Sequence, residues 1–299
     1  ALIAGGALAQ DGDAIIVADS LELAATGYTF TEGPAWDGSR LIFSDIPGDT
    51  VYVYSPGEGA PQVLYTPSAN ANGHTFDREG RLLNAEHGSG EITRWAMPEP
   101  LGWVVERAGG GFIAGFRSGF AALDLDPLRI QHIGNPEPDL PGNRINDGKA
   151  DSTGAIWCGT MDFDCEGEHG SLYRLTPDRK WQRVDSGYGV ANGPAFSPDG
   201  KWLYHTDTIK RVIYRFARTE TGLESREEFI RFAEADGSPD GMTTDAQGGL
   251  WVAHWGGSRV SRFAPDGSLD QSVALPAQQV TNLAFAGASL DRLFVTSAA

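Results

Sequence analysis

Six carboxylate and amide side chains recur at similar intervals along the chain, each near the start of an apolar, strand-like run. They are Glu32, Asn72, Asn146, Asn192, Asp240 and Asn282. Carboxylate and amide oxygens are hard ligands of the kind that Ca²⁺ or another divalent cation accepts in proteins. The set therefore predicts a cation site, provided that the fold brings these positions together.

An Asn or Asp before a glycine has a second explanation, because both side chains mimic backbone turns and tolerate the left-handed conformation. For any one of the asparagines, Asn146 included, a simple turn stays an open alternative. Glu32 has no such explanation, since a turn does not favour Glu in Glu-Gly-Pro. His87 and His254 follow apolar segments, and we interpret them as solvated or core histidines. A Gly-x-Ser-x-Gly elbow does not occur, so serine-hydrolase chemistry is set aside.

An internal repeat of roughly 40 to 50 residues supplies the elements that would position these side chains. Its clearest copy starts at Asn192, runs through an apolar segment that ends at Thr208, and continues with Arg211–Phe216 and a segment near 228–232. This copy is typical of four antiparallel strands. Matching copies begin near Glu32, Asn72, Asn146 and Asp240, and weaker ones near Trp103 and Thr281. We count seven units, with six as the alternative.

Repeated four-stranded units with almost no helical periodicity predict an all-β fold, a β-propeller. The first strand of every propeller blade lines the central channel, so residues at the unit starts would converge. The last unit holds only two strands, whereas apolar segments at 14–18 and 21–25 precede the first unit. We expect the two termini to complete one blade together, as a clasp that closes the propeller.

Composition excludes several partners. The 299 residues carry 23 Lys and Arg against 40 Asp and Glu, a net charge of −17, which repels nucleic acid and anionic lipid. No apolar stretch approaches the ~20 residues that span a bilayer. Residues 1–13 resemble a signal-peptide remnant or are a flexible N-terminus, and 14–299 form one propeller domain. A remnant would place the protein in the periplasm or outside the cell, and otherwise we expect it in the cytoplasm.

Several short motifs jointly resemble the regucalcin and gluconolactonase family, the senescence-marker-protein-like lactonases. They are Glu32-Gly-Pro-Ala-Trp, Arg144-Ile-Asn-Asp-Gly-Lys, Cys158-Gly-Thr-Met-Asp, Ala191-Asn-Gly, Ser238-Pro-Asp-Gly-Met and Arg292-Leu-Phe-Val-Thr-Ser. The resemblance runs from about residue 20 to the C-terminus and implies a six-bladed propeller with one divalent metal. Up to Trp95 the chain is similar to the gluconolactonase branch, and from Leu101 to the regucalcin branch. A natural insertion or a chimeric junction near Met97–Pro100 would explain a seventh unit.

The resemblance also implies roles for particular residues. Glu32, Asn192 and Asp240 would hold the metal, with Ca²⁺ favoured and Zn²⁺, Mn²⁺ or Mg²⁺ as alternatives. Arg144, Asn146 and Asp164 would bind the substrate, a small-molecule sugar lactone. Asp164 is shorter than the Glu that the family usually has there. Asp240 would also accept a proton from the attacking water, while the cation polarises the ester carbonyl.

Two other functions stay open. A paraoxonase-like arylesterase or lactonase would use a similar calcium propeller on hydrophobic esters. A calcium-binding propeller without catalysis would keep the metal ligands, because a fold does not by itself determine function. The sequence makes no prediction of the oligomeric state.

Overall fold

The described part of the structure, a computed structural model, comprises residues 2–5, 22–76, 82–84, 97–125, 127–287 and 289–298. Its regular structure consists of strands β1 to β26 and one 3₁₀ turn at Glu234–Asp236. The strands form small antiparallel sheets, most of them built from consecutive strands. This is the β-propeller arrangement that the repeat predicts. His87 and the predicted strand at 14–18 lie outside the described residues.

The chain divides into two compact units, each described here by itself. Unit 1 comprises Ala1–Glu91, Ala235–Thr243 and Gly249–Ala299, and unit 2 comprises Ile92–Glu234 and Thr244–Gly248.

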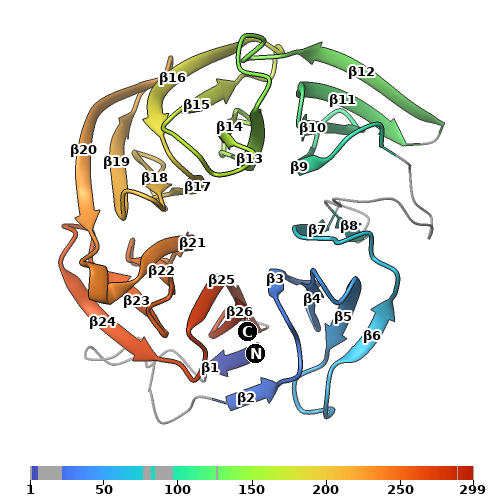
Figure 1. The fold of residues 1–299 in the computed structure, drawn as a ribbon, viewed down its shortest axis with the longest axis vertical. Coiled ribbons are helices and arrows are strands. Elements are labelled where there is room, and N and C mark those ends of the chain that lie inside the picture. Colours follow the sequence, from blue (N-terminus) through green and yellow to red (C-terminus); the bar gives the residue numbers. More distant parts are fainter. Residues whose placement is uncertain are drawn as a thin grey trace. The chain divides into compact units, whose positions relative to one another are not determined.

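Unit 2 contains three four-stranded sheets, which follow one another in chain order (Figure 1). The first is β9 (Leu101–Glu106), β10 (Phe112–Phe116), β11 (Gly119–Leu125) and β12 (Leu128–Gly134). The second is β13 (Asn143–Ala150), β14 (Ile156–Asp162), β15 (Gly170–Leu175) and β16 (Trp181–Tyr188). The third is β17 (Ala191–Phe196), β18 (Trp202–Asp207), β19 (Val212–Arg218) and β20 (Leu223–Arg231).

Unit 1 contains a four-stranded sheet of β3 (Thr31–Trp36), β4 (Leu41–Asp45), β5 (Thr50–Tyr54) and β6 (Gln62–Tyr65). β7 (His74–Phe76) and β8 (Leu82–Asn84) form a two-stranded sheet. An eight-stranded sheet contains β21 (Ser238–Thr244), β22 (Leu250–Trp255), β23 (Arg259–Phe263), β24 (Leu269–Ala274), β25 (Gln279–Ala286), β26 (Arg292–Ala298), β1 (Leu2–Gly5) and β2 (Glu22–Ala25).

The number of sheets corrects the expected six or seven units. Among the described residues, five sheets have four or more strands. β22 and β25 pair at one position, Trp255 with Gln279, and this pair joins two sets of four strands into one sheet. Within the described residues, the unit that begins at Asn72 contributes β7 and β8. A sequence period marks repeated strands but does not show which strands hydrogen-bond, so the count was wrong.

The expected pairing of the two termini is confirmed. β1 pairs antiparallel with β26, from Leu2 opposite Thr296 to Gly5 opposite Leu293. β2 then pairs with β1 and lies at the sheet edge. The N-terminal strand next to β26 is therefore at 2–5, within the range that we interpreted as a remnant or a flexible end, and the predicted segment at 21–25 forms β2.

Burial explains why the apolar segments form these strands. β4, β10 and the first six residues of β14 are buried at every position, as expected for strands covered on both faces. The last strands of the sheets, such as β6 and β20, are mostly exposed. Trp157, 1% exposed, packs with Leu172 of its own sheet and with Leu203 and Phe216 of the next sheet of unit 2. Ala191, the residue before Asn192, belongs to the same core, so this packing positions the first strand that carries Asn192.

Candidate active site

Glu32 and Asn192 each lie at a β-bulge in the first strand of a sheet. In β3, Glu32 pairs with Ser44, and the next paired residue is Ala35 opposite Ile42. The same shift occurs in β17, between Asn192 and Ala195. A bulge bends the strand and changes the direction of its side chains, and bulges are frequent beside active sites. Both bulges contain the Gly-Pro pair that follows the candidate ligand in the sequence.

Asn146 and Asn282 lie at further bulges. In β13 the shift falls between Ile145 and Gly148, so Asn146 and Asp147 occupy the bulge. In β25 the shift falls just before Asn282. Four of the six residues identified in the repeat thus share one local feature. The turn alternative therefore does not apply to Asn146, which lies within a strand.

A chain of hydrogen bonds in unit 2 connects three of the predicted residues. Arg144 donates from Nη1 to Oδ1 of Asn146 at 2.6 Å. Asn146 donates from Nδ2 to Oδ1 of Asn192 at 2.9 Å and to the Ala191 carbonyl at 2.7 Å. Asn192 in turn donates to Oγ1 of Thr208 at 2.9 Å. These bonds fix the orientation of both amides and place the guanidinium of Arg144 next to them.

Asp147 belongs to the same cluster, although the sequence analysis did not single it out. Its carboxylate accepts a hydrogen bond from the Gly193 backbone NH at 3.2 Å. Its side chain keeps contact with solvent, but desolvation by the surrounding protein raises its pKa, against the lowering effects of that NH, Arg144 and Lys149. Desolvation likewise lowers the pKa of Lys149, and Asp147 opposes this. Asp147 therefore binds a proton more readily than an ordinary aspartate.

Unit 1 brings another group of predicted residues together. Oε2 of Glu32 accepts from the Gly33 backbone NH at 2.8 Å and from Nδ2 of Asn282 at 3.3 Å. A Cβ atom at Gly241, the residue after Asp240, would lie 2.4 Å from Oδ1 of Asn282. Asn282 is therefore packed between the backbone beside Asp240 and the carboxylate of Glu32.

Five of the six predicted site residues fall into two groups, one in each unit, and Asp164 lies apart from both. Glu32 and Asp240 lie in unit 1, and Arg144, Asn146 and Asn192 in unit 2. Asp164 lies in the exposed turn after β14, where its backbone NH donates to Oδ1 of Asp162 at 2.9 Å. No contact among the described residues connects the Asp164 carboxylate to Arg144 or Asn146.

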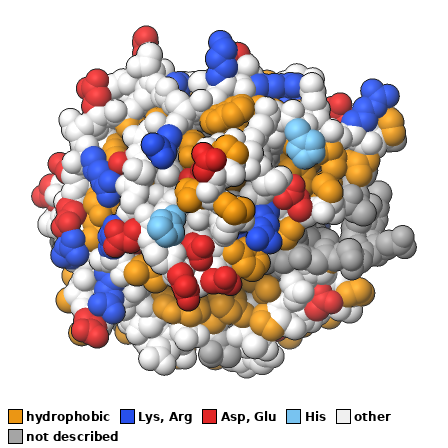
Figure 2. All heavy atoms as spheres, turned by 45° about the horizontal axis from the view of Figure 1, so that its top comes forward, with side chains coloured by type: hydrophobic (Ala, Val, Ile, Leu, Met, Phe, Trp, Pro, Cys, Tyr) orange, Lys and Arg blue, Asp and Glu red, His pale blue; other side chains and the backbone are white. Residues whose placement is uncertain are grey.

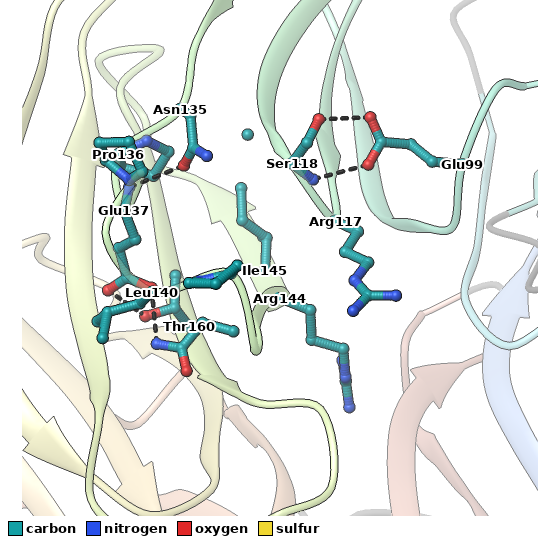
Figure 3. Close-up of a pocket in the computed structure, with 14 residues that line it drawn as sticks. Glu99, Arg117, Ser118, Asn135, Pro136, Glu137, Leu140, Arg144, Ile145 and Thr160 are labelled. Atoms are coloured by element: carbon teal, nitrogen blue, oxygen red, sulfur yellow. Dashed lines mark hydrogen bonds between the residues drawn. The ribbon is translucent and has the colours of Figure 1, made fainter.

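A cavity of about 300 Å³ lies in unit 2 beside Arg144 (Figure 3). Its lining includes Glu99, Arg117, Leu140 and Thr160. Figure 3 shows the side chains of Arg117 and Arg144 extending toward the same side, away from Glu99. The sequence analysis missed Arg117, because it follows β10 in a turn and lies outside the repeated unit starts.

A buried carboxylate, Glu137, forms one wall of this cavity. It is 9% exposed and accepts from Asn143 at 2.8 Å, from Oγ1 of Thr160 at 2.9 Å and from the Tyr173 hydroxyl at 3.1 Å. Burial and the Glu137 carboxylate both raise the pKa of Tyr173, so its hydroxyl keeps the proton that it donates. Three neutral donors thus satisfy Glu137, as a buried carboxylate requires.

The chemistry of the predicted metal ligands fits a hard divalent cation. Glu32 and Asp240 offer carboxylates and Asn192 an amide oxygen, the donors that Ca²⁺, Mg²⁺ and Mn²⁺ prefer. Within the described ranges, no group of three or more His, Cys, Asp and Glu side chains is placed to hold a metal. Coordination of one ion by residues of both units stays a prediction.

Figure 2 shows one face of the molecule, on which acidic and basic side chains are interspersed with uncharged ones. None of the helical structure in the described residues is long and apolar enough to cross a membrane.

The sequence matches the family model described as the SMP-30/Gluconolactonase/LRE-like region over residues 30–299. The chain belongs to this family. The match covers both units, including all six residues that we predicted for the site.

Individual relatives extend this comparison. The chain is 35% identical over 220 residues to 6-deoxy-6-sulfogluconolactonase of Pseudomonas putida, covering 73% of this chain and 76% of that protein. It is 34% identical over 277 residues to a pentonolactonase of Haloferax volcanii, covering 91% and 83%. The crystal structure of a calcium-binding protein, regucalcin from Agrobacterium tumefaciens, matches with a TM-score of 0.66 and 27% identity, covering 91% and 83%.

Proposed function

We propose that this protein hydrolyses the ester bond of a sugar lactone to give the aldonic acid, and that one divalent cation assists the reaction. The observation that carries the proposal is the hydrogen-bonded series Arg144, Asn146 and Asn192 at bulged first strands of unit 2. It offers a guanidinium and amides to an oxygen-rich substrate. Two relatives, named a sulfogluconolactonase and a pentonolactonase, support a lactone as the substrate.

Glu32, Asn192 and Asp240 are the residues that would hold the cation. Asn192 accepts a hydrogen bond from Asn146 at Oδ1, and an amide oxygen has a second lone pair for a ligand. A cation bound there would supply Lewis-acid polarisation of the lactone carbonyl. The regucalcin structure, named a calcium-binding protein, supports Ca²⁺ as the ion.

Asp240 is the proposed general base. It takes a proton from water as the water oxygen bonds to the carbonyl carbon, and the ring C–O bond then breaks. The leaving ring oxygen receives a proton and becomes a hydroxyl of the aldonic acid. Arg144 donates hydrogen bonds to the oxygen that gains negative charge, because its guanidinium has N–H groups beyond the one bonded to Asn146. A contact between Asp164 and the substrate stays a prediction, and its carboxylate lies in an exposed turn after β14.

The test is acid release from glucono-δ-lactone in a pH-stat, for the wild type, Asp240→Asn and the control Asp178→Asn. Asp178 is exposed and pairs with Lys180 at the surface, so its substitution removes equal charge without touching the site. We expect about a 10²- to 10⁴-fold loss of kcat for Asp240→Asn and none for the control.

Unchanged turnover by Asp240→Asn would remove this residue from the mechanism. Hydrolysis of aryl esters without hydrolysis of sugar lactones would favour the paraoxonase-like alternative. Cation binding without hydrolysis of either substrate would favour the non-catalytic propeller.

A further inference from the structure

Two arginines on the wall of the unit 2 cavity form no direct ion pair with a carboxylate among the described residues, although Asp147 lies near enough to Arg144 to interact with it electrostatically. Neither Arg117 nor Arg144 forms an ion pair there. The Arg117 guanidinium lies over the Phe163 ring, 4.8 Å from its centroid, and Arg144 donates one hydrogen bond to Asn146. A guanidinium has five N–H donors, so most donors of both residues remain for a ligand.

The acidic residues of the cavity are engaged in a different way. Glu137 is satisfied by Asn143, Thr160 and Tyr173. Glu99 accepts from the backbone NH of Ser118 at 2.8 Å and from the Ser118 hydroxyl, and Figure 3 shows this pair on the far side of the cavity from Arg144. The cavity therefore presents hydrogen-bond donors to a ligand, while its carboxylates are already bonded.

We propose that the cavity selects sugar lactones that carry an acidic substituent, which Arg117 binds. This inference rests on the proposed function, since Arg144 adjoins both the cavity and the substrate-binding amides. Paired N–H groups of a guanidinium match the oxygens of a carboxylate, sulfonate or phosphate. Arg117 thus determines specificity, and the reacting ester stays with the residues of the proposed active site.

The volume of the cavity and the net charge of the protein are both compatible with an acidic sugar lactone. A volume of about 300 Å³ is at the lower end for ligand pockets and suits a monosaccharide. The net charge of −17 repels anions at long range. Salt screens this repulsion beyond about 8 Å at physiological ionic strength, so an anion inside the cavity responds mainly to the nearby arginines.

The test compares kcat/KM for two substrates, neutral glucono-δ-lactone and anionic D-glucaro-1,4-lactone, across three variants. Arg117→Gln removes the charge, Arg117→Lys keeps it, and Arg129→Gln is the matched control on the exposed side of β12. We expect Arg117→Gln to lower the ratio of acidic to neutral kcat/KM about 10- to 100-fold, mainly through KM. We expect the ratio for Arg117→Lys to lie between those of Arg117→Gln and the wild type. For Arg129→Gln we expect the wild-type ratio.

An equal loss on both lactones for Arg117→Gln would show that Arg117 only supports the fold through Phe163, and would overturn the proposal. An unchanged ratio would overturn it as well. Thermal unfolding of each variant identifies any that fails to fold, and Arg117→Lys then provides the comparison.

Calorimetric titration with the D-glucarate dianion separates this inference from the lactonase proposal, because it needs no turnover. Glucarate binding that Arg117→Gln weakens about 10-fold or more would support the anion site even if no lactone is hydrolysed. Lactone hydrolysis together with glucarate binding that is equal in the wild type and Arg117→Gln would leave the function standing and reject the site.

Discussion

The side-chain amide of Asn146 donates a hydrogen bond to Oδ1 of Asn192 at 2.9 Å, and this bond joins the first strands of two neighbouring sheets. The guanidinium of Arg144 donates a second hydrogen bond, at 2.6 Å, to Oδ1 of Asn146. The Asn146 amide therefore positions two groups: Asn192, a proposed metal ligand, and the guanidinium of Arg144, which we propose binds the substrate. Because both amide atoms are used, we expect a change at Asn146 to affect both proposed functions.

Asn146→Ala tests this coupling. We expect kcat/KM for the lactone to fall about 10- to 100-fold, because small displacements of positioning groups are costly in rate. Cation affinity should fall as well, since Asn192 loses the donor that orients it. Gln131→Ala, an exposed amide on β12, is the control. Loss of turnover with unchanged cation affinity would contradict the link between Asn146 and Asn192.

Gly33→Ala tests the bulge that presents Glu32. A Cβ atom at Gly33 would lie 1.9 Å from the Asn72 carbonyl oxygen, and the backbone φ is +59°. We expect a loss of about 2 to 4 kcal/mol in the free energy of unfolding, from overpacking and backbone strain together. Chemical denaturation measures this loss.

Gly256→Ala is the matched control for Gly33→Ala. Its φ is +78°, but no atom of the described residues lies within 4 Å of the added Cβ, so we expect only the strain of about 1 kcal/mol. Equal losses in the two variants would show that the contact with Asn72 does not constrain the bulge.

His205 predicts a pH dependence of stability. Its side chain is fully buried, neither ring nitrogen has a hydrogen-bond partner among the described residues, and desolvation lowers its pKa to about 3. The native state therefore keeps this ring neutral, while the unfolded chain binds a proton below about pH 6.5. The stability contributed by the neutral ring falls as the pH drops from 6.5 toward 3.

His205→Leu isolates this effect. Between pH 7 and pH 5 the wild type should lose about 2 kcal/mol more unfolding free energy than the variant. Denaturant titrations at the two pH values measure the difference. Parallel losses in both proteins would show that His205 becomes protonated inside the fold.

The sequence repeat predicted the strand units and the residues at their starts because both are local. Glu32 and Asn192, each followed by Gly-Pro, could be identified as special before the bulges were known. The pairing of Trp255 with Gln279 depends on how two units meet, and the repeat carries no information about it. The strand at 2–5 was missed because its apolar residues resemble a signal peptide as much as a strand.

The cavity was beyond sequence reasoning for a related reason. Arg117, Glu137 and Arg144 come from different loops and strands. Only the packing of two sheets brings them together around one cavity. Asp164 was proposed from a motif position, and its contact with a substrate stays a prediction, since the structure shows only its backbone NH bonded to Asp162 in an exposed turn. Asp147 was not singled out from the sequence, because only the bulge in β13 and the fold bring its carboxylate to the Gly193 backbone NH.

The most direct test of the account is the metal dependence of lactone hydrolysis by the full chain. Protein stripped with a chelator is assayed on glucono-δ-lactone in a pH-stat, and Ca²⁺, Mn²⁺, Zn²⁺ or Mg²⁺ is then added in turn. We predict that stripping abolishes acid release, that one bound cation per chain restores it, and that Glu32→Gln weakens this restoration. Full hydrolysis by protein without detectable metal, or no hydrolysis with any of the four ions, would contradict it.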